Sequence, residues 1–506
     1  MCIFPALESS STETARCSVL KLALISLDHD DEHVHDKELK FGADSIVCNC
    51  LRRAVAIDVK SRETDRLCRL LEAIYKCSDA MAAASFCRYG AVLFPLLVTV
   101  ASSSSPRLRS KMAAARLLQR TNPLGILLSA IKDADLLMIA LVRFLRTCLV
   151  DCQNNALLAL GSIIIHRESK PIVARFPGLL EAVIGSAEKC KGEAVAVLMN
   201  LASDSRNKAA IAKTRGLLEL LKRSCASKEP GIRRNACSSL VHLSSESSIK
   251  EMLVTFESGL LVDRLNNLLR DGKSDIRYKA LQTISNMVSE STANVIGNAT
   301  NLLEQLGDIG SSSPATDCSI VASKAIKRLS TYMQTRHKGH QTLCEALVRM
   351  SKSPGFDVSL WTARAYIGQS LNVSSSFFMV RSESAIAGLL SLARSKHGRV
   401  RASAVEAIAN LVQEPANARR LSTNEAVVNT LIYNIDAKGD TGGTENARRQ
   451  AVRAILLIAN HRSASKRAAK QRGLIQSLSR YGTSVDGDIE LKRAALHGVL
   501  VLAPSM

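Results

Sequence analysis

Residues 194–202 read AVAVLMNLA, and the same pattern returns along the chain. It recurs as ACSSLVHLS at 236–244, as ALQTISNMV at 280–288 and as AVEAIANLV at 404–412. Each copy has a small residue, a second short side chain three residues later, an aliphatic residue, a polar position and another aliphatic residue. Because a helix turns by about 100° per residue, the small and aliphatic positions share one face. The pattern therefore predicts an amphipathic helix that occurs repeatedly.

The polar position of this helix recurs at a nearly constant interval. Nine steps cover the 379 residues from 119 to 498, which gives a mean period of about 42 residues. Such a period is typical of helical repeat arrays, in which each unit packs only on its neighbours. The clear copies have Asn200, His242, Asn286 and Asn410 at this position, and weaker copies have Gln119, Ser162, Arg328, Gln369, Leu457 and Gly498.

Glycines form a second signal in phase with the first. A glycine follows many of the polar positions by sixteen or seventeen residues, and an apolar stretch follows each glycine. Because glycine adopts a positive φ at little steric cost, these residues predict tight turns between two helices. Where the glycine is absent, an apolar helix still starts in register, as at Leu302 and Leu303. The recurring glycines are Gly90, Gly178, Gly216, Gly259 and Gly473.

A helix that begins at a glycine, a polar loop and an Ala-rich helix that ends in Asn-Leu together resemble the armadillo repeat. The matching motifs are GLLELL at 216–221, GLLVDRLNNLL at 259–269 and AGLLSLA at 387–393. HEAT repeats are the main alternative, but the phased glycines and the Asn-Leu pairs favour armadillo. The resemblance implies an all-α fold: a right-handed α-solenoid, an armadillo-like superhelix, of about 10–12 three-helix repeats whose third helices line a concave groove.

The repeats are expected to fill most of the chain. We assign residues 67–506 to a continuous armadillo repeat array, and residues 1–66 to an N-terminal capping region with one or two degenerate repeats. The most extended interval, from 410 to 457, contains the polar segment KGDTGGTE at 438–445. An insertion confined to a loop is what a solenoid tolerates.

The polar position suggests how the groove binds a ligand. The resemblance implies that this residue hydrogen-bonds the backbone of an extended peptide, and an Asn side chain offers both a donor and an acceptor. The alternative is that these side chains cap or bridge neighbouring helices. Importin-α-type adaptors place a Trp one turn before the Asn, whereas none of the residues four before the polar positions here is Trp, so recognition of basic nuclear signals is not favoured. The candidates are Asn200, His242, Asn286, Gln369 and Asn410.

Basic residues lie on the same expected face. Lys324 and Arg328 are one helical turn apart, and so are Arg449 and Arg453. The resemblance implies that such residues bind acidic extended segments, as the groove of β-catenin does in that family. Guanidinium groups also suit carboxylates and phosphates chemically. The alternative is a solvated helix face with no partner.

The charge of the chain limits the classes of partner but does not select one. The formal net charge is +21, which favours acidic protein segments, RNA or an anionic membrane surface. Aromatic residues are only 4% of the chain, which leaves few rings for base stacking and disfavours sequence-specific RNA recognition. We therefore expect a protein-interaction scaffold or adaptor that binds an extended acidic protein segment. Nucleic-acid (RNA) or anionic-membrane association through the basic surface is the alternative, and a nuclear-transport adaptor is less favoured.

No catalytic motif is found, so we expect no enzyme activity and no cofactor. The glycines are explained by the repeat, and no HExxH pattern or phosphate-binding loop occurs. The 14 cysteines lack zinc-ligand spacing, so no metal site is expected. No apolar run is long enough for a transmembrane segment, and we expect a cytoplasmic or nuclear location. The basic run KRAAKQR at 466–472 is interpreted as an exposed helical face. The oligomeric state stays open.

Overall fold

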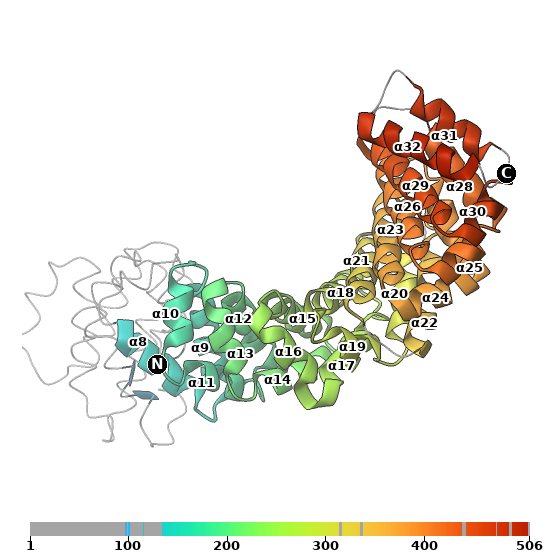
Figure 1. Ribbon diagram of the computed structural model, residues 1–506. Coiled ribbons are helices and arrows are strands. Elements are labelled where there is room, and N and C mark those ends of the chain that lie inside the picture. Colours follow the sequence, from blue (N-terminus) through green and yellow to red (C-terminus); the bar gives the residue numbers. More distant parts are fainter. Residues whose placement is uncertain are drawn as a thin grey trace, which may run out of the picture. The chain divides into compact units, whose positions relative to one another are not determined.

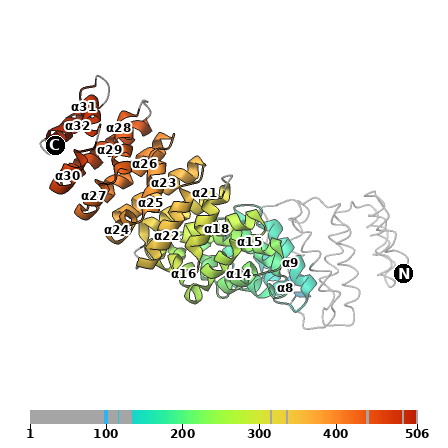
Figure 2. The ribbon, with the colours of Figure 1, turned by 90° about the vertical axis from the view of Figure 1, so that its right-hand side faces the viewer.

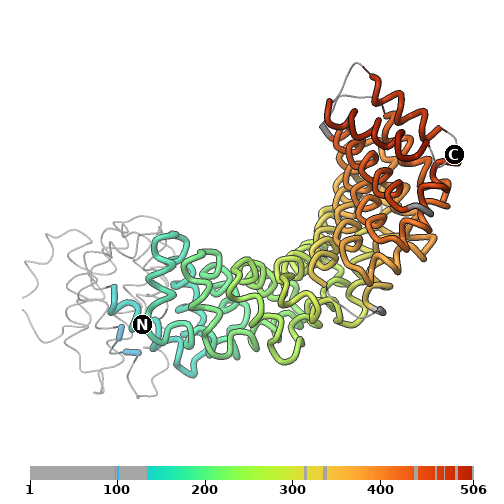
Figure 3. Tube along the Cα trace, in the orientation of Figure 1, coloured from blue at the N-terminus to red at the C-terminus, as the bar shows by residue number. Residues whose placement is uncertain are grey.

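The computed structural model describes residues 97, 98, 100, 101 and 115, and residues 134–503 apart from 313–315, 334–336, 438–441, 472 and 485–487. These residues form helices joined by short turns, and none of them lies in a strand. The chain divides into two compact units, Met1–Glu246 (unit 1) and Ser247–Met506 (unit 2). Within each unit the Cα trace passes from one helix directly to the next (Figure 3). The predicted all-α solenoid is confirmed, whereas the predicted boundary after residue 66 lies outside the described residues.

The described helices of unit 1 are α8 (Ala134–Leu145), α9 (Val150–Ile163), α10 (Ser169–Arg175), α11 (Leu179–Ser186), α12 (Lys191–Ala202), the 3-10 helix η3 (Ser205–Asn207), α13 (Lys208–Lys213), α14 (Leu217–Cys225) and α15 (Pro230–Ser244). From α10 onward, the described α-helices of unit 1 come in groups of three, in which a short helix is followed by a longer one and then by the longest.

The described helices of unit 2 are α16 (Ser247–Thr255), the 3-10 helix η4 (Phe256–Gly259), α17 (Leu260–Leu268), α18 (Ser274–Met287), α19 (Ala293–Gly297), α20 (Leu302–Gly310), α21 (Asp317–Tyr332), α22 (His337–Met350), α23 (Phe356–Leu371), α24 (Val373–Arg381), α25 (Glu383–Ala393), α26 (Gly398–Leu411), α27 (Pro415–Leu421), α28 (Glu425–Asp436), α29 (Gly442–Ala459), α30 (Arg462–Ala468), α31 (Leu474–Gly482) and α32 (Ile489–Leu502). The described helices of unit 2 follow the same order, except that the single helix α22 precedes α23.

Most of the described repeats have three helices, whereas α23 follows the single helix α22 and takes the place of a third helix. These third helices pack in succession. In unit 1, α9 packs on α12 and α12 packs on α15. In unit 2 the same succession runs through α18, α21, α23, α26, α29 and α32. Figure 1 shows these six helices along one side of unit 2, with α22, α24, α25 and α30 along the other, and Figure 2 shows the repeats in chain order. Each repeat therefore adds one third helix to a common face.

Residues in the left-handed backbone region start the second helices, as the glycine spacing predicted. Gly178, Gly216, Gly259 and Gly473 have φ angles of 73°, 84°, 98° and 86°. An L side chain is strained in this region, which explains why glycine recurs there. Where the glycine is missing, the start of the second helix varies. Before α20, Asn301 takes the same conformation with φ 58°, which Asn tolerates better than most residues, whereas Ser382 before α25 and Asn424 before α28 are extended.

The small residues of the third helices make their close packing possible. Ala194, Ala236, Ala280 and Ala404 are each fully buried. At Gly368 of α23 there is no room even for a Cβ, because an added Cβ would lie 2.8 Å from the backbone oxygen of Ser330 in α21. Short side chains let helix backbones approach closely, so that the aliphatic residues beside them fill the core. Stability therefore comes from repeat stacking on repeat.

Candidate protein-binding site on the third helices

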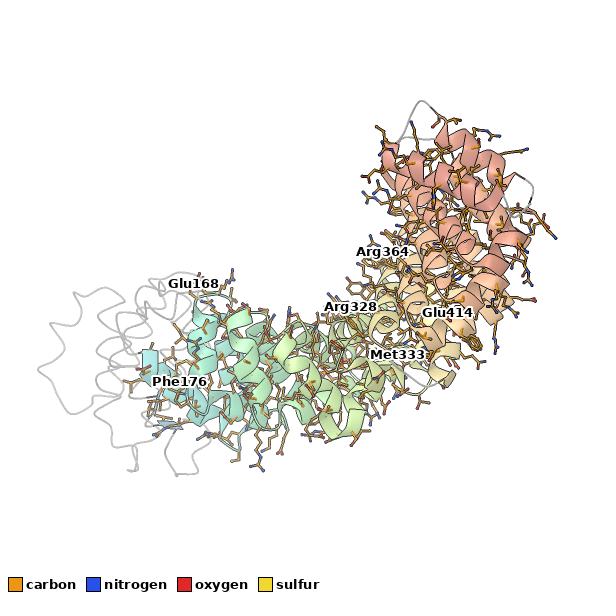
Figure 4. The ribbon with its side chains drawn as sticks, in the orientation of Figure 1. Glu168, Phe176, Arg328, Met333, Arg364 and Glu414 are labelled. Atoms are coloured by element: carbon orange, nitrogen blue, oxygen red, sulfur yellow. The ribbon has the colours of Figure 1, made fainter. Side chains whose placement is uncertain are left out.

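The exposed edges of α18, α21, α23, α26, α29 and α32 form a surface that we name the third-helix face. Because these helices pack in succession, residues about one repeat apart in sequence become neighbours on this surface. Arg328 on α21 and Arg364 on α23 both lie on it, on the side of unit 2 where Figure 1 places the third helices (Figure 4). The face thus gathers basic side chains from successive repeats.

Two cations flank the only tryptophan of the chain. The ammonium nitrogen of Lys324 lies 5.6 Å from the ring centroid of Trp361, and the guanidinium carbon of Arg364 lies 5.0 Å from it. Lys324 and Trp361 are half-buried, while Arg364 is exposed. Cations this close to an indole ring are attracted by its quadrupole. We name these three residues the Trp361 cluster.

The cations of the Trp361 cluster have no acidic partner within the part of the chain that the structure describes. Neither Lys324 nor Arg364 forms a salt bridge or a side-chain hydrogen bond with a described residue. Two positive charges held on one ring by adjacent helices repel each other and attract an anion. The arrangement can therefore bind a carboxylate or a phosphate group without first breaking an internal ion pair.

The side chain of Arg328 is hydrogen-bonded to the neighbouring third helix. Its Nη1 donates a hydrogen bond to the backbone oxygen of Ser285, near the carboxyl end of α18. A cation at this end of a helix satisfies a terminal carbonyl and matches the helix dipole. Lys250 of α16 lies nearby: its partial burial, and then the positive charge of Arg328, lower the pKa of Lys250. Arg328 therefore adds to the local positive potential, but its side chain is held by α18.

In the second predicted arginine pair, Arg449 and Arg453, Arg449 forms an internal salt bridge. Arg449 Nη2 lies 2.6 Å from Asp488 Oδ2, and the side chain of Arg449 is more than half exposed. Arg453, also exposed, donates to the amide oxygen of Gln450 at 3.3 Å and forms no salt bridge with a described residue. Asp488 thus partly neutralises the positive charge of Arg449, and no described carboxylate does so for Arg453.

The predicted polar ladder is not one continuous row. Gln369 is fully buried and donates to the backbone oxygen of Ser330 at 3.2 Å. Asn410 is 8% exposed and donates to Ser370 Oγ at 3.3 Å. Both side chains bridge neighbouring third helices, which is the alternative interpretation of these positions, and they are not on the exposed face.

The remaining ladder residues are half-buried on their third helices. They are Asn200 on α12, His242 on α15 and Asn286 on α18. The amide of Asn200 makes no side-chain hydrogen bond to another described residue. A role in binding a peptide backbone stays a prediction for these three residues.

Arg364 and the position of Trp361 were missed by the sequence pattern. On α23 the exposed row runs through Arg364 and Leu371, one residue out of phase with Gln369. The signal was nevertheless present, because Lys324 and Arg364 are 40 residues apart, close to one repeat, and Trp361 precedes Arg364 by three residues on the same helix. None of the described helices is long and apolar enough to span a bilayer, and the described residues contain no group of three His, Cys, Asp or Glu side chains arranged to hold a metal ion.

One comparison with known proteins, the search of solved structures, bears on the fold. No protein-family model matches the chain, and no curated protein matches it. A solved structure from a study of a phosphorylation switch that controls the interaction between cadherin and beta-catenin is similar, with a TM-score of 0.57, 14% identity and 98% of each chain covered. An engineered protein aligns with a TM-score of 0.49 and 18% identity over 90% of this chain and 98% of its own. The first likeness supports an armadillo-like helical-repeat fold.

Proposed function

We propose that this chain is a protein-interaction scaffold whose third-helix face in unit 2 binds an extended acidic segment of another protein. The Trp361 cluster carries the proposal. Its cations come from two adjacent repeats and have no carboxylate partner in the described part of the chain. A ligand carboxylate can therefore join two existing positive charges, which costs less than displacing an internal partner.

The same geometry disfavours a basic ligand. An indole ring can hold the aliphatic stem of a ligand lysine, but here Lys324 and Arg364 already lie within 6 Å of the ring of Trp361. A third cation in the same place meets like-charge repulsion. The solved structure that is similar to this chain comes from a study of the interaction between cadherin and beta-catenin, and this supports a protein as the class of partner.

Charge reversal at the cluster tests the proposal. The probe is a fluorescein-labelled peptide in which Glu alternates with Ser, and binding is measured by fluorescence anisotropy on the full chain. Lys324→Glu/Arg364→Glu should weaken binding at least about tenfold, because attraction is replaced by repulsion at both positions. Both side chains reach solvent, and neither is part of the fully buried core, so the variant is expected to fold.

The control variant makes the same change of charge elsewhere in unit 2. Lys466→Glu/Arg467→Glu reverses two exposed residues of α30, a first helix, and should bind the peptide nearly as the wild type does. Equal loss in the two variants would mean that net charge, not the cluster, controls binding. Tighter binding of a single-stranded RNA oligonucleotide or of anionic vesicles, with the same dependence on the cluster, would instead favour the alternative function.

A further inference from the structure

The row of exposed residues on α23 combines a positive charge with an apolar side chain. Leu371 is 66% exposed and lies seven residues after Arg364 on the same helix. Seven residues are nearly two turns, so the two side chains leave α23 within about 20° of each other. At 1.5 Å per residue they are separated by about 10 Å along the helix axis.

Gly368 lets α21 approach α23 closely between these two side chains. It lies one turn after Arg364, and an added Cβ would lie 2.8 Å from the backbone oxygen of Ser330. Close contact with α21 at this point therefore requires glycine. Arg364 and Leu371 thus stand on either side of the point where α23 meets α21.

Helix α21 carries a second exposed apolar side chain at the level of Leu371. Lys324 is close to Trp361, and Ser330 touches Gly368, so α21 and α23 run side by side in the same direction. Tyr332, two residues after Ser330 at the end of α21, is 40% exposed. It therefore lies level with the end of α23, where Leu371 is. The two adjacent helices place cations at one end of a short stretch of surface and apolar side chains at the other.

We infer that the segment bound here has two parts: a carboxylate that contacts Arg364 and Lys324, and an apolar side chain that packs on Leu371 and Tyr332. An extended chain advances about 3.3 Å per residue, so about 10 Å corresponds to three residues. The preferred ligand is thus a protein segment in which a large aliphatic residue follows or precedes an acidic residue by three positions. This inference rests on the proposed function and specifies the partner's sequence.

A double-mutant cycle between ligand and protein tests the inference. One labelled peptide has Leu three residues after a Glu in the Glu-Ser background, and its partner has Ser at that position. Leu371→Ser replaces an exposed side chain, so it should not disturb folding. We expect the Leu peptide to bind the wild-type chain about five- to tenfold more tightly than the Ser peptide, and Leu371→Ser to remove most of that difference.

The spacing between the two ligand residues can be tested, and failure of the two-part ligand can be told apart from failure of the acidic site. In two further peptides with a single Glu among Ser residues, Leu three residues after the Glu should strengthen binding more than Leu directly after it. If Leu371→Ser weakens the Leu and Ser peptides equally, or neither, the two-part ligand is refuted while the acidic site stands. If the Ser peptide binds Lys324→Glu/Arg364→Glu as tightly as it binds the wild type, the proposed function itself is refuted.

Discussion

Replacing Asp204 by Asn should destabilise unit 1 at neutral pH and have little effect near pH 2. Asp204 lies between α12 and α13 with its side chain almost fully buried, and it forms a 2.8 Å salt bridge with Arg206. The side-chain hydrogen bonds from Arg206 lower the pKa of Asp204 from its ordinary value of 3.8 to about 2. Asn retains an oxygen that can accept from the backbone N–H of Arg206, so the variant removes the charge and keeps the turn.

The magnitude follows from the change in pKa. The difference between 3.8 and about 2 corresponds to roughly 2.5 kcal/mol of folding free energy, at 1.36 kcal/mol per pKa unit. Solvent screens part of this, because Arg206 is 49% exposed and the more distant Arg167 is 79% exposed. We therefore expect a loss of about 1–2 kcal/mol. Since the folded pKa is depressed, this stability is present in full above about pH 4 and is lost as the pH falls through 2.

Urea unfolding followed by far-UV circular dichroism, from pH 7 down to pH 2, measures the difference between the wild type and Asp204→Asn. Comparing the two proteins cancels the titration of the other carboxylates. Repeat arrays often unfold in steps, so amide hydrogen exchange of peptides that cover 200–213 should locate the change. A difference that stays constant across the pH range, or that grows in acid, would refute the role given to the Asp204 charge.

Four further substitutions test other parts of the structure. Gly216→Ala should lower the free energy of unfolding by about 1 kcal/mol, because φ is 84° at this position. Asn301→Gly should raise it by a few tenths of a kcal/mol, because glycine adopts a positive φ more easily than Asn. The two variants should therefore shift the urea midpoint in opposite directions. Gly368→Ala should cost about 1–3 kcal/mol, because its Cβ meets the backbone of α21 at 2.8 Å, and an unchanged melting temperature would contradict that contact. Asp488→Asn keeps the N-cap of α32 and removes the salt bridge to Arg449. The variant should therefore bind the acidic peptide slightly more tightly, and this gain should disappear in high salt. An unchanged affinity would place Arg449 outside the binding surface.

The repeat and its turns could be predicted because both are local. A helix that buries one small and aliphatic face must stack, and this requirement leaves a periodic pattern in the sequence. The left-handed conformation at Gly178 and Gly473 follows from residue chemistry alone. The same reasoning extends to Asn301, which takes the glycine's place where the pattern had only an apolar helix start.

The exposed face could be predicted only in part, because rotation of each helix is set by its neighbours. Gln369 fits the polar position by spacing, but the close contact of Gly368 with α21 fixes the rotation of α23 and buries Gln369. Trp361 is eight residues before Gln369, off the four-residue spacing of importin-α-type adaptors, although it pairs with cations one repeat apart. Likewise, the partner of Arg449 is Asp488, 39 residues later, and only the packed repeats bring the two together.

Emission from the single tryptophan tests the binding site most directly. Trp361 is the only Trp of the chain, and its ring lies within 6 Å of both cations proposed to receive the ligand carboxylate. Titrating the unlabelled Glu-Ser peptide with Leu three residues after a Glu into the wild-type chain should give a saturable change in Trp361 emission. The change should weaken with salt, persist in Lys466→Glu/Arg467→Glu and disappear in Lys324→Glu/Arg364→Glu. Saturable binding seen by anisotropy with no change in Trp361 emission would show that acidic segments bind elsewhere on the protein.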